Sequence, residues 1–170
     1  MNTIKERKTK KLYQYALSKE IAIDIDENCP DSIMGIAIKL PQERYVIAMQ
    51  KDEDKLLPYT RLEILAHEMG HCMTNSFYDS FTPCEGRKDA EELANLWAYT
   101  YVMNPSEIEQ AYKEGAREID DLAYYFGVSF EFVEKALDAY LTDKCEEFLE
   151  SYCEFYFRSR KKEDGNERSH

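Results

Sequence analysis

The H-E-x-x-H motif at residues 67–71 constrains this chain more than any other feature of its sequence. His67 and His71 are four residues apart, so on a helix their imidazoles project from one face and can bind a single Zn²⁺ ion. Glu68 is turned about 100° around the helix from His67. A carboxylate at that position is suited to act on water at the metal rather than to bind the metal itself.

The sequence around the motif favours a half-buried helix over a surface helix that merely carries two solvated histidines. Thr60 and Glu63 fit a capping box with Thr60 as the N-cap, and Pro58 ends the preceding element. An apolar stripe runs beside the histidines and consists of Leu62, Leu65, Ala66 and Met69. Unpaired imidazole nitrogens on a partly buried face are unfavourable, and a metal ion would satisfy them.

Length and composition limit the function classes. The 170 residues suit one domain with a substantial core. The formal net charge of −12 argues against a general nucleic-acid binder or a binder of anionic membranes. No apolar run is long enough to span a membrane, and residues 1–11 are polar and lysine-rich, so no signal peptide is expected. Cysteines at positions 29, 72, 84, 145 and 153 show no disulfide-framework spacing and indicate free thiols in a reducing cytoplasm.

Periodicity and turn residues predict a mostly helical α+β fold with a small antiparallel sheet beside the motif helix, and the H-E-x-x-H motif makes this domain zincin-like. Besides the motif helix, we expect helices over residues 3–19 and 88–103, one capped by Ser106, helices within 119–140, and a last helix that continues to about residue 158. The expected strands cover residues 21–25, 33–40 and 45–50, and a loop near the metal covers 75–88. These elements form a single domain over residues 1–158, followed by a disordered tail at 159–170.

The sequence leaves two roles open for the expected sheet. An exposed edge strand could pair with an extended peptide and hold it over the metal. The sheet could equally serve only to cover the motif helix.

A zinc site with two histidines needs a third protein ligand, which leaves a fourth position for water. Glu91 is the best candidate, because it shares one helical face with Ala94, Asn95 and Ala98. The small residues on that face would let this helix approach Gly70 of the motif helix closely. Glycine inside a helix costs roughly 1 kcal/mol relative to alanine, so close approach explains Gly70 better than helix formation does.

Three further side chains near the motif need an assignment. Glu92 faces about 100° away from Glu91 and is the second choice for the third ligand. Cys72 directly follows His71 but points away from His67, which favours a thiol in the core over a ligand. A tyrosine could help zinc to hold the oxyanion of the reaction, but the chain has 13 tyrosines and the sequence does not single one out.

Several segments together resemble the ImmA/IrrE family of metallopeptidases. The residues that carry the resemblance are HEMGHC at 67–72, SFY at 76–78, an E-x-x-A-N-x-x-A pattern at 91–98, Asn-Pro at 104–105, and LAYYFGVS at 122–129. The resemblance covers about residues 33–140 and is more specific than H-E-x-x-H alone. Two features depart from the family pattern: Asn-Pro stands where an apolar residue and proline are common, and residues 141–158 form an acidic, aromatic helix without an assigned role.

The resemblance implies a gluzincin-like zinc site in which His67, His71 and Glu91 are the ligands and Glu68 is the catalytic carboxylate. It further implies a zinc-dependent endopeptidase from a phage or another mobile element. Members of this family cleave, or otherwise relieve, a helix-turn-helix repressor that is usually encoded beside them. A repressor of that kind is therefore the expected protein partner.

Two other functions stay open at this point. Residues 119–140 also look like a helix-turn-helix, which would make the chain a DNA-binding regulator. The second helix of that unit carries Glu131, Glu134 and Asp138 against the single Lys135, and such a face would repel phosphate. Alternatively, the chain could hold a metal and bind a repressor without cutting it, because an intact site does not by itself prove turnover.

Overall fold

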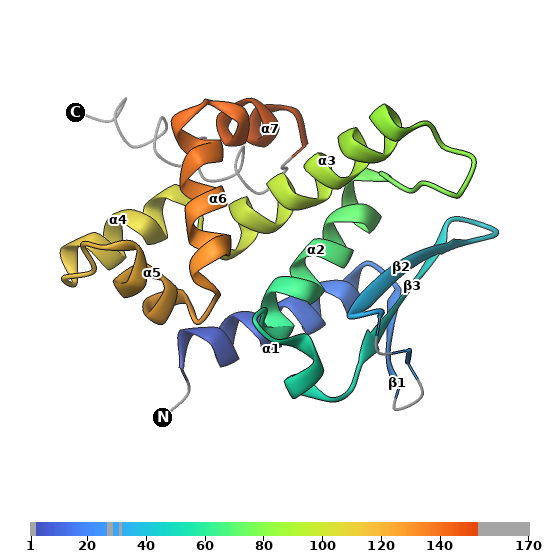
Figure 1. Ribbon diagram of the computed structural model, residues 1–170, viewed down its shortest axis with the longest axis horizontal. Coiled ribbons are helices and arrows are strands. Elements are labelled where there is room, and N and C mark those ends of the chain that lie inside the picture. The colour runs from blue at the N-terminus through green and yellow to red at the C-terminus, as the bar shows by residue number, and fades with distance from the viewer. Residues whose placement is uncertain (1–2, 27–28, 31, 153–170) are drawn as a thin grey trace, which may run out of the picture.

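A computed structural model describes residues 3–26, 29–30 and 32–152, and it confirms the α+β class (Figure 1). The described helices are α1 (Ile4–Ser18), α2 (Arg61–Thr74), α3 (Cys84–Val102), α4 (Pro105–Lys113), α5 (Ile119–Phe126), α6 (Phe130–Leu141) and α7 (Lys144–Tyr152), with a short 3₁₀ turn η1 (Glu53–Leu56) before α2. The strands are β1 (Ile21–Asp26), β2 (Gly35–Leu40) and β3 (Arg44–Gln50). The sheet lies on one side of α2 and helices α4, α5 and α6 lie on the other, while α1 passes behind α2 and contacts both α2 and β1.

The motif helix α2 begins where the sequence predicts. Thr60 is its N-cap, and the reciprocal capping box with Glu63 is present. The helix ends at Asn75, whose φ of 53° gives the left-handed cap that commonly stops helices. The apolar stripe predicted beside the histidines is fully buried and comprises Leu62, Leu65, Ala66 and Met69. Burial of this stripe fixes the rotation of α2 and therefore the direction in which its histidines project.

The sheet is mixed rather than purely antiparallel. The strand order is β1-β3-β2, with the predicted hairpin between β2 and β3 and a parallel pairing between β1 and β3. The central position of β3 follows from its side chains, because Ile47 and Met49 are completely buried and neighbours on both sides are needed to satisfy their backbone groups. Among the described residues, β2 is therefore an edge strand, and it contacts α2.

The boundaries of α3 and α4 differ from the prediction. Residues 84–88 belong to α3, so the loop after the motif helix is shorter and ends at Pro83. The N-cap of α4 is Asn104 rather than Ser106, because the Asn104 side chain accepts a hydrogen bond from the Glu107 backbone N–H and Pro105 occupies the first helical turn.

The prediction that the last helix continues without a break past Leu141 is wrong. Helix α6 ends at Leu141, and Asp143 adopts a positive φ of 60° before α7 begins. A residue in that conformation cannot continue an α-helix, so α6 and α7 are separate elements. The part of the predicted helix after Tyr152 and the predicted tail at 159–170 lie outside the described residues.

The helix-turn-helix-like unit consists of α5, a turn at Gly127 with a φ of 69°, and α6. Its inward face is buried in the core and includes Phe126, Val133 and Ala136. The carboxylate of Glu63 accepts hydrogen bonds from the Ser129 backbone N–H and hydroxyl, which fastens the start of α6 to the start of α2. No helix of the described part is both long and apolar enough to cross a membrane.

Candidate metal centre

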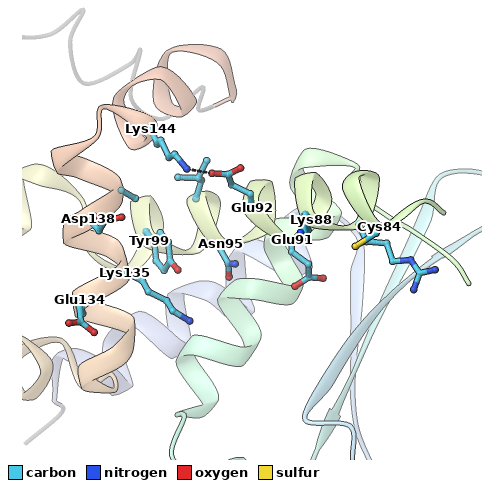
Figure 2. A pocket seen from close by; sticks show the side chains of 13 residues that line it. Cys84, Lys88, Glu91, Glu92, Asn95, Tyr99, Glu134, Lys135, Asp138 and Lys144 are labelled. Carbon is cyan, nitrogen blue, oxygen red and sulfur yellow. Dashed lines mark hydrogen bonds and ion pairs between the residues drawn. The ribbon is translucent and has the colours of Figure 1, made fainter.

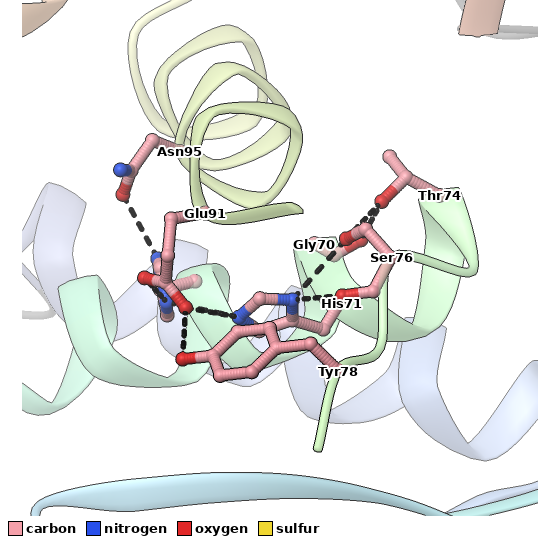
Figure 3. Close-up of polar contacts among 8 residues, drawn as sticks. Gly70, His71, Thr74, Ser76, Tyr78, Glu91 and Asn95 are labelled. Atoms are coloured by element: carbon pink, nitrogen blue, oxygen red, sulfur yellow. Dashed lines mark hydrogen bonds and ion pairs between the residues drawn. The ribbon is translucent and has the colours of Figure 1, made fainter. Parts of the chain in front are cut away.

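Helices α2 and α3 bring His67, His71 and Glu91 together (Figure 3). The two Nε2 atoms lie 3.2 Å apart. The Glu91 carboxylate lies across both of them, with Oε2 3.3 Å from Nε2 of His67 and Oε1 3.3 Å from Nε2 of His71. Three side chains that the sequence proposed as ligands thus converge on one point.

The opposite ring nitrogens are held by partners that the sequence did not identify. The Nδ1 atom of His71 lies 2.7 Å from the backbone carbonyl oxygen of Ser76, so this nitrogen carries the hydrogen and donates it. The Nδ1 atom of His67 lies 2.9 Å from Oδ1 of Asn95 and donates in the same way in this orientation of the amide. Asn95 lies one turn after Glu91 on the same face of α3, and that spacing was the available signal.

This tautomer leaves an electron pair on each Nε2 atom. Two nitrogen electron pairs and a carboxylate that point toward one another repel unless a proton or a cation lies between them. Imidazole and carboxylate are ligands of divalent transition metals, and partners on the far ring nitrogens are typical of metal-binding histidines. The donor set therefore fits a metal ion held by His67, His71 and Glu91.

Electrostatics couple these groups. Without a metal, a protonated imidazole also carries a hydrogen on Nε2, and hydrogen bonds from His67 and His71 in that form keep the pKa of the Glu91 carboxyl well below its usual range. Burial lowers the pKa of His67, but the hydrogen bond to Glu91 and the charges of Glu68 and Glu91 outweigh burial, so the net shift is upward. Both shifts reflect a carboxylate that stays ionised beside the imidazoles.

Glu68 is buried beside this group but is not part of it. Its side chain lies under β2, where a Cβ atom on Gly35 would lie 3.0 Å from Cγ and 3.3 Å from Oε1 of Glu68. Burial raises the pKa of the Glu68 carboxyl, while the nearby imidazoles and the Ala37 backbone N–H oppose that rise. A buried carboxyl with a raised pKa next to a metal centre has the properties of a general base.

Glu92 and Cys72, the less favoured candidates near the motif, both lie apart from the three proposed ligands. Glu92 forms an ion pair with Lys144 at the start of α7, away from the imidazoles. Cys72 is buried in the hydrophobic core, and burial raises the pKa of its thiol to about 12. Neither residue belongs to the group that could hold a metal.

The loop between α2 and α3 adds a residue that sequence reasoning left unassigned. The hydroxyl of Tyr78 donates a hydrogen bond to Oε1 of Glu91 at 2.7 Å (Figure 3). The carboxylate of Glu91 raises the pKa of Tyr78 to about 12, so this phenol is neutral at physiological pH.

A groove of about 760 Å³ opens beside the metal-site residues (Figure 2). It follows one face of α3 from Arg87 and Lys88, past Glu91 and Asn95, to the neighbouring face of α6. The part of the groove between Glu91 and Tyr99 is about 12 Å long at 1.5 Å per residue, which matches three to four residues of an extended peptide.

A comparison with known proteins identifies the family of this chain. The family model Peptidase_M78, described as an IrrE N-terminal-like domain, matches residues 38–138, a span that contains all four predicted site residues. No curated protein and no solved structure matches the chain. The predicted resemblance is confirmed, and the chain belongs to the Peptidase_M78 family of metallopeptidase-related, IrrE N-terminal-like domains.

Proposed function

We propose that this protein is a cytoplasmic, zinc-dependent endopeptidase of the ImmA/IrrE type. The observation that carries the proposal is the convergence of His67, His71 and Glu91 with buried Glu68 beside them. Ligand atoms bound at about 2.0–2.1 Å to one tetrahedral zinc ion lie about 3.3–3.4 Å apart. The separations of 3.2 Å and 3.3 Å among the three side chains agree with that spacing.

In this proposal each side chain has a separate task. His67, His71 and Glu91 hold the zinc ion, which supplies Lewis acidity toward water and toward the scissile carbonyl. Glu68 accepts a proton from the attacking water and then delivers it to the leaving amine nitrogen. Asn95 and the Ser76 carbonyl keep both imidazoles in the ligating tautomer.

The arrangement around the site suits an extended protein segment. The edge strand β2 lies against α2 beside Glu68, and its unpaired side can accept a peptide strand. The groove along α3 passes Glu91 and can take the continuation of that peptide. We therefore favour a substrate with a locally unfolded or extended segment over a small molecule.

The proposed substrate is a helix-turn-helix repressor of a phage or another mobile element. The resemblance to the ImmA/IrrE family supports this proposal, and so does the charge of the chain, because an acidic protein with a net charge of −12 suits a basic, DNA-binding partner. Direct DNA binding through α5 and α6 is disfavoured, because Glu134 and Asp138 are exposed on α6 beside a single lysine, Lys135.

The decisive experiment compares wild-type protein with Glu68→Gln. Purified, untagged wild type should contain about one zinc per chain and should cleave a helix-turn-helix repressor encoded beside its gene. Glu68→Gln should keep the zinc and lose cleavage. If wild type carries no zinc or other divalent transition metal, the proposal fails. If Glu68→Gln still relieves repression, the protein acts by binding and not by hydrolysis.

A further inference from the structure

Tyr78 approaches the candidate metal centre without being one of its ligands. Its hydroxyl bonds Oε1 of Glu91, and this same oxygen lies 3.3 Å from Nε2 of His71. The Tyr78 ring stands edge-on to the His71 ring, with 6.1 Å between centroids. The phenolic O–H is thus a donor that bonds directly to an oxygen of a proposed ligand.

Other tyrosine hydroxyls with described partners bond elsewhere. That of Tyr45 donates to Glu43, that of Tyr59 to Glu131, and that of Tyr140 to the Met103 carbonyl. Among the tyrosine hydroxyls whose partners are described, that of Tyr78 bonds a proposed ligand. Tyr78 is therefore our candidate for the oxyanion donor that the sequence left unassigned.

The loop that carries Tyr78 is fastened on both sides of it. Before it, Ser76 bonds an imidazole of α2. After it, the Asp79 carboxylate accepts hydrogen bonds from the backbone N–H and hydroxyl of Thr82. Arg87 of α3 donates to the Thr82 carbonyl oxygen. The hydroxyl is therefore positioned by the same two helices that supply the proposed ligands, which is the preorganisation that charge stabilisation requires.

The Tyr78 hydroxyl can change its hydrogen-bond acceptor during a reaction, from the Glu91 carboxylate to an oxyanion of the substrate. A carboxylate that neutralises a divalent cation is a weaker acceptor than a free one, because the cation draws its electron density. An uncharged substrate carbonyl competes poorly for the same donor. When that carbonyl becomes an oxyanion, it becomes the stronger acceptor, and the donor gains by moving to it. An interaction that strengthens only in the transition state raises kcat rather than substrate affinity.

We propose that Tyr78 is a catalytic residue that donates a hydrogen bond to the oxyanion of peptide hydrolysis, and this inference rests on the proposed function. Water forms a C–O bond to the carbonyl carbon, the π electron pair moves to the carbonyl oxygen, and a water proton passes to Glu68. The Tyr78 O–H turns from Glu91 to that oxygen. The C–N bond then breaks, Glu68 gives its proton to the amine nitrogen, and Tyr78 returns to Glu91.

The test uses Tyr78→Phe in the full-length, zinc-loaded protein, with Tyr45→Phe as the matched control. Both changes remove one phenolic oxygen, but the Tyr45 hydroxyl bonds exposed Glu43 in the turn between β2 and β3. Peptides from a digested bacterial proteome serve as the first substrate, and the best-cleaved sequence is remade as a phosphinic peptide, which mimics the tetrahedral oxyanion. Zinc affinity, kcat, KM and the Kd of the phosphinic peptide are measured for each variant.

The proposal expects Tyr78→Phe to lower kcat by about 10²- to 10³-fold with little change in KM. It also expects the Kd of the phosphinic peptide to rise by a similar factor, with zinc affinity unchanged and Tyr45→Phe like wild type. Unchanged kcat and Kd in Tyr78→Phe would overturn it. So would a loss of zinc affinity that accounts for the whole defect, because Tyr78 would then act only by holding Glu91. Absence of hydrolysis by wild type would instead refute the proposed function.

Discussion

A Cβ atom on Gly70 would overlap the backbone carbonyl oxygen of Ala94 and would lie only 2.8 Å from the Cα atom of Ala94. Helices α2 and α3 therefore touch backbone to backbone at this position, as the sequence predicted from Gly70 and the small residues of α3. The contact lies between the turn that carries His71 and the turn after Glu91. It sets the spacing of the two helices, and with it the distance from the Glu91 carboxylate to the imidazoles.

Gly70→Ala should destabilise the protein and weaken its metal affinity. The added methyl group meets the backbone of Ala94, which cannot rotate away, so α2 and α3 must separate. Overpacking of this kind costs about 1–3 kcal/mol and outweighs the gain of roughly 1 kcal/mol in helix propensity. Thermal unfolding with and without zinc measures both effects.

Gly86→Ala is the matched control for that experiment. Gly86 also lies within a helix, but an added Cβ atom meets only a side-chain methyl of Thr82, at 3.2 Å. This variant should be as stable as wild type or slightly more stable. Equal melting temperatures for Gly70→Ala and Gly86→Ala would contradict the close contact between α2 and α3.

Asn95→Leu should weaken zinc binding by about 10- to 100-fold, which is the usual effect of losing a partner behind a ligating histidine. The Asn95 oxygen holds the Nδ1 hydrogen of His67, and leucine offers no acceptor there. Asn95→Asp keeps an acceptor at that position and should retain zinc affinity. Competition with a zinc-selective chelator measures both variants, and equal weakening in the two would show that the hydrogen bond has no such role.

Gly35→Ala should reduce hydrolysis while leaving zinc in place. A Cβ atom at residue 35 would lie 2.7 Å from Cγ2 of Ile64 and 3.0 Å from Cγ of Glu68, so the strand or the Glu68 side chain must shift. We expect kcat to fall by about 10- to 100-fold, since a misplacement of about 1 Å costs on the order of 10²-fold. Steady-state kinetics and zinc content are measured on the same samples.

The double variant Gly35→Ala/Ile64→Ala separates this effect from a general loss of structure. Removing Cγ2 of Ile64 relieves the closer of the two contacts and should restore part of the lost kcat. Full activity of Gly35→Ala alone would show that the contact between β2 and Glu68 is not needed for hydrolysis.

The cysteines should differ sharply in reactivity. Burial raises the pKa of Cys145 to about 12, so at pH 8 its thiol is almost entirely protonated, and only the thiolate reacts with iodoacetamide. Raising the pH to 9 increases the thiolate fraction of Cys145 about tenfold but leaves it near 0.1 per cent. Cys84 is exposed at the start of α3. Mass spectrometry of the native protein should find Cys84 alkylated long before Cys145, and comparable native rates would contradict the burial of Cys145.

The sequence by itself determined the parts of this protein that depend on local helical geometry. The spacing of His67 and His71, the capping box at Thr60, and the face shared by Glu91 and Asn95 all follow from 3.6 residues per turn. Even the close contact between α2 and α3 could be predicted from the sequence, because a glycine within a helix is unfavourable unless another backbone packs against it. The side chains predicted as ligands were found together for this reason.

Only the tertiary structure decided which groups from distant segments complete the site. Nothing in the sequence shows that the Tyr78 hydroxyl reaches Glu91, that Gly35 lies over Glu68, or that β1 pairs in parallel with β3. These contacts join residues that are far apart in the chain or separated by an irregular loop. Their geometry depends on how whole elements bury their apolar faces against one another, and no local repeat in the sequence encodes that packing.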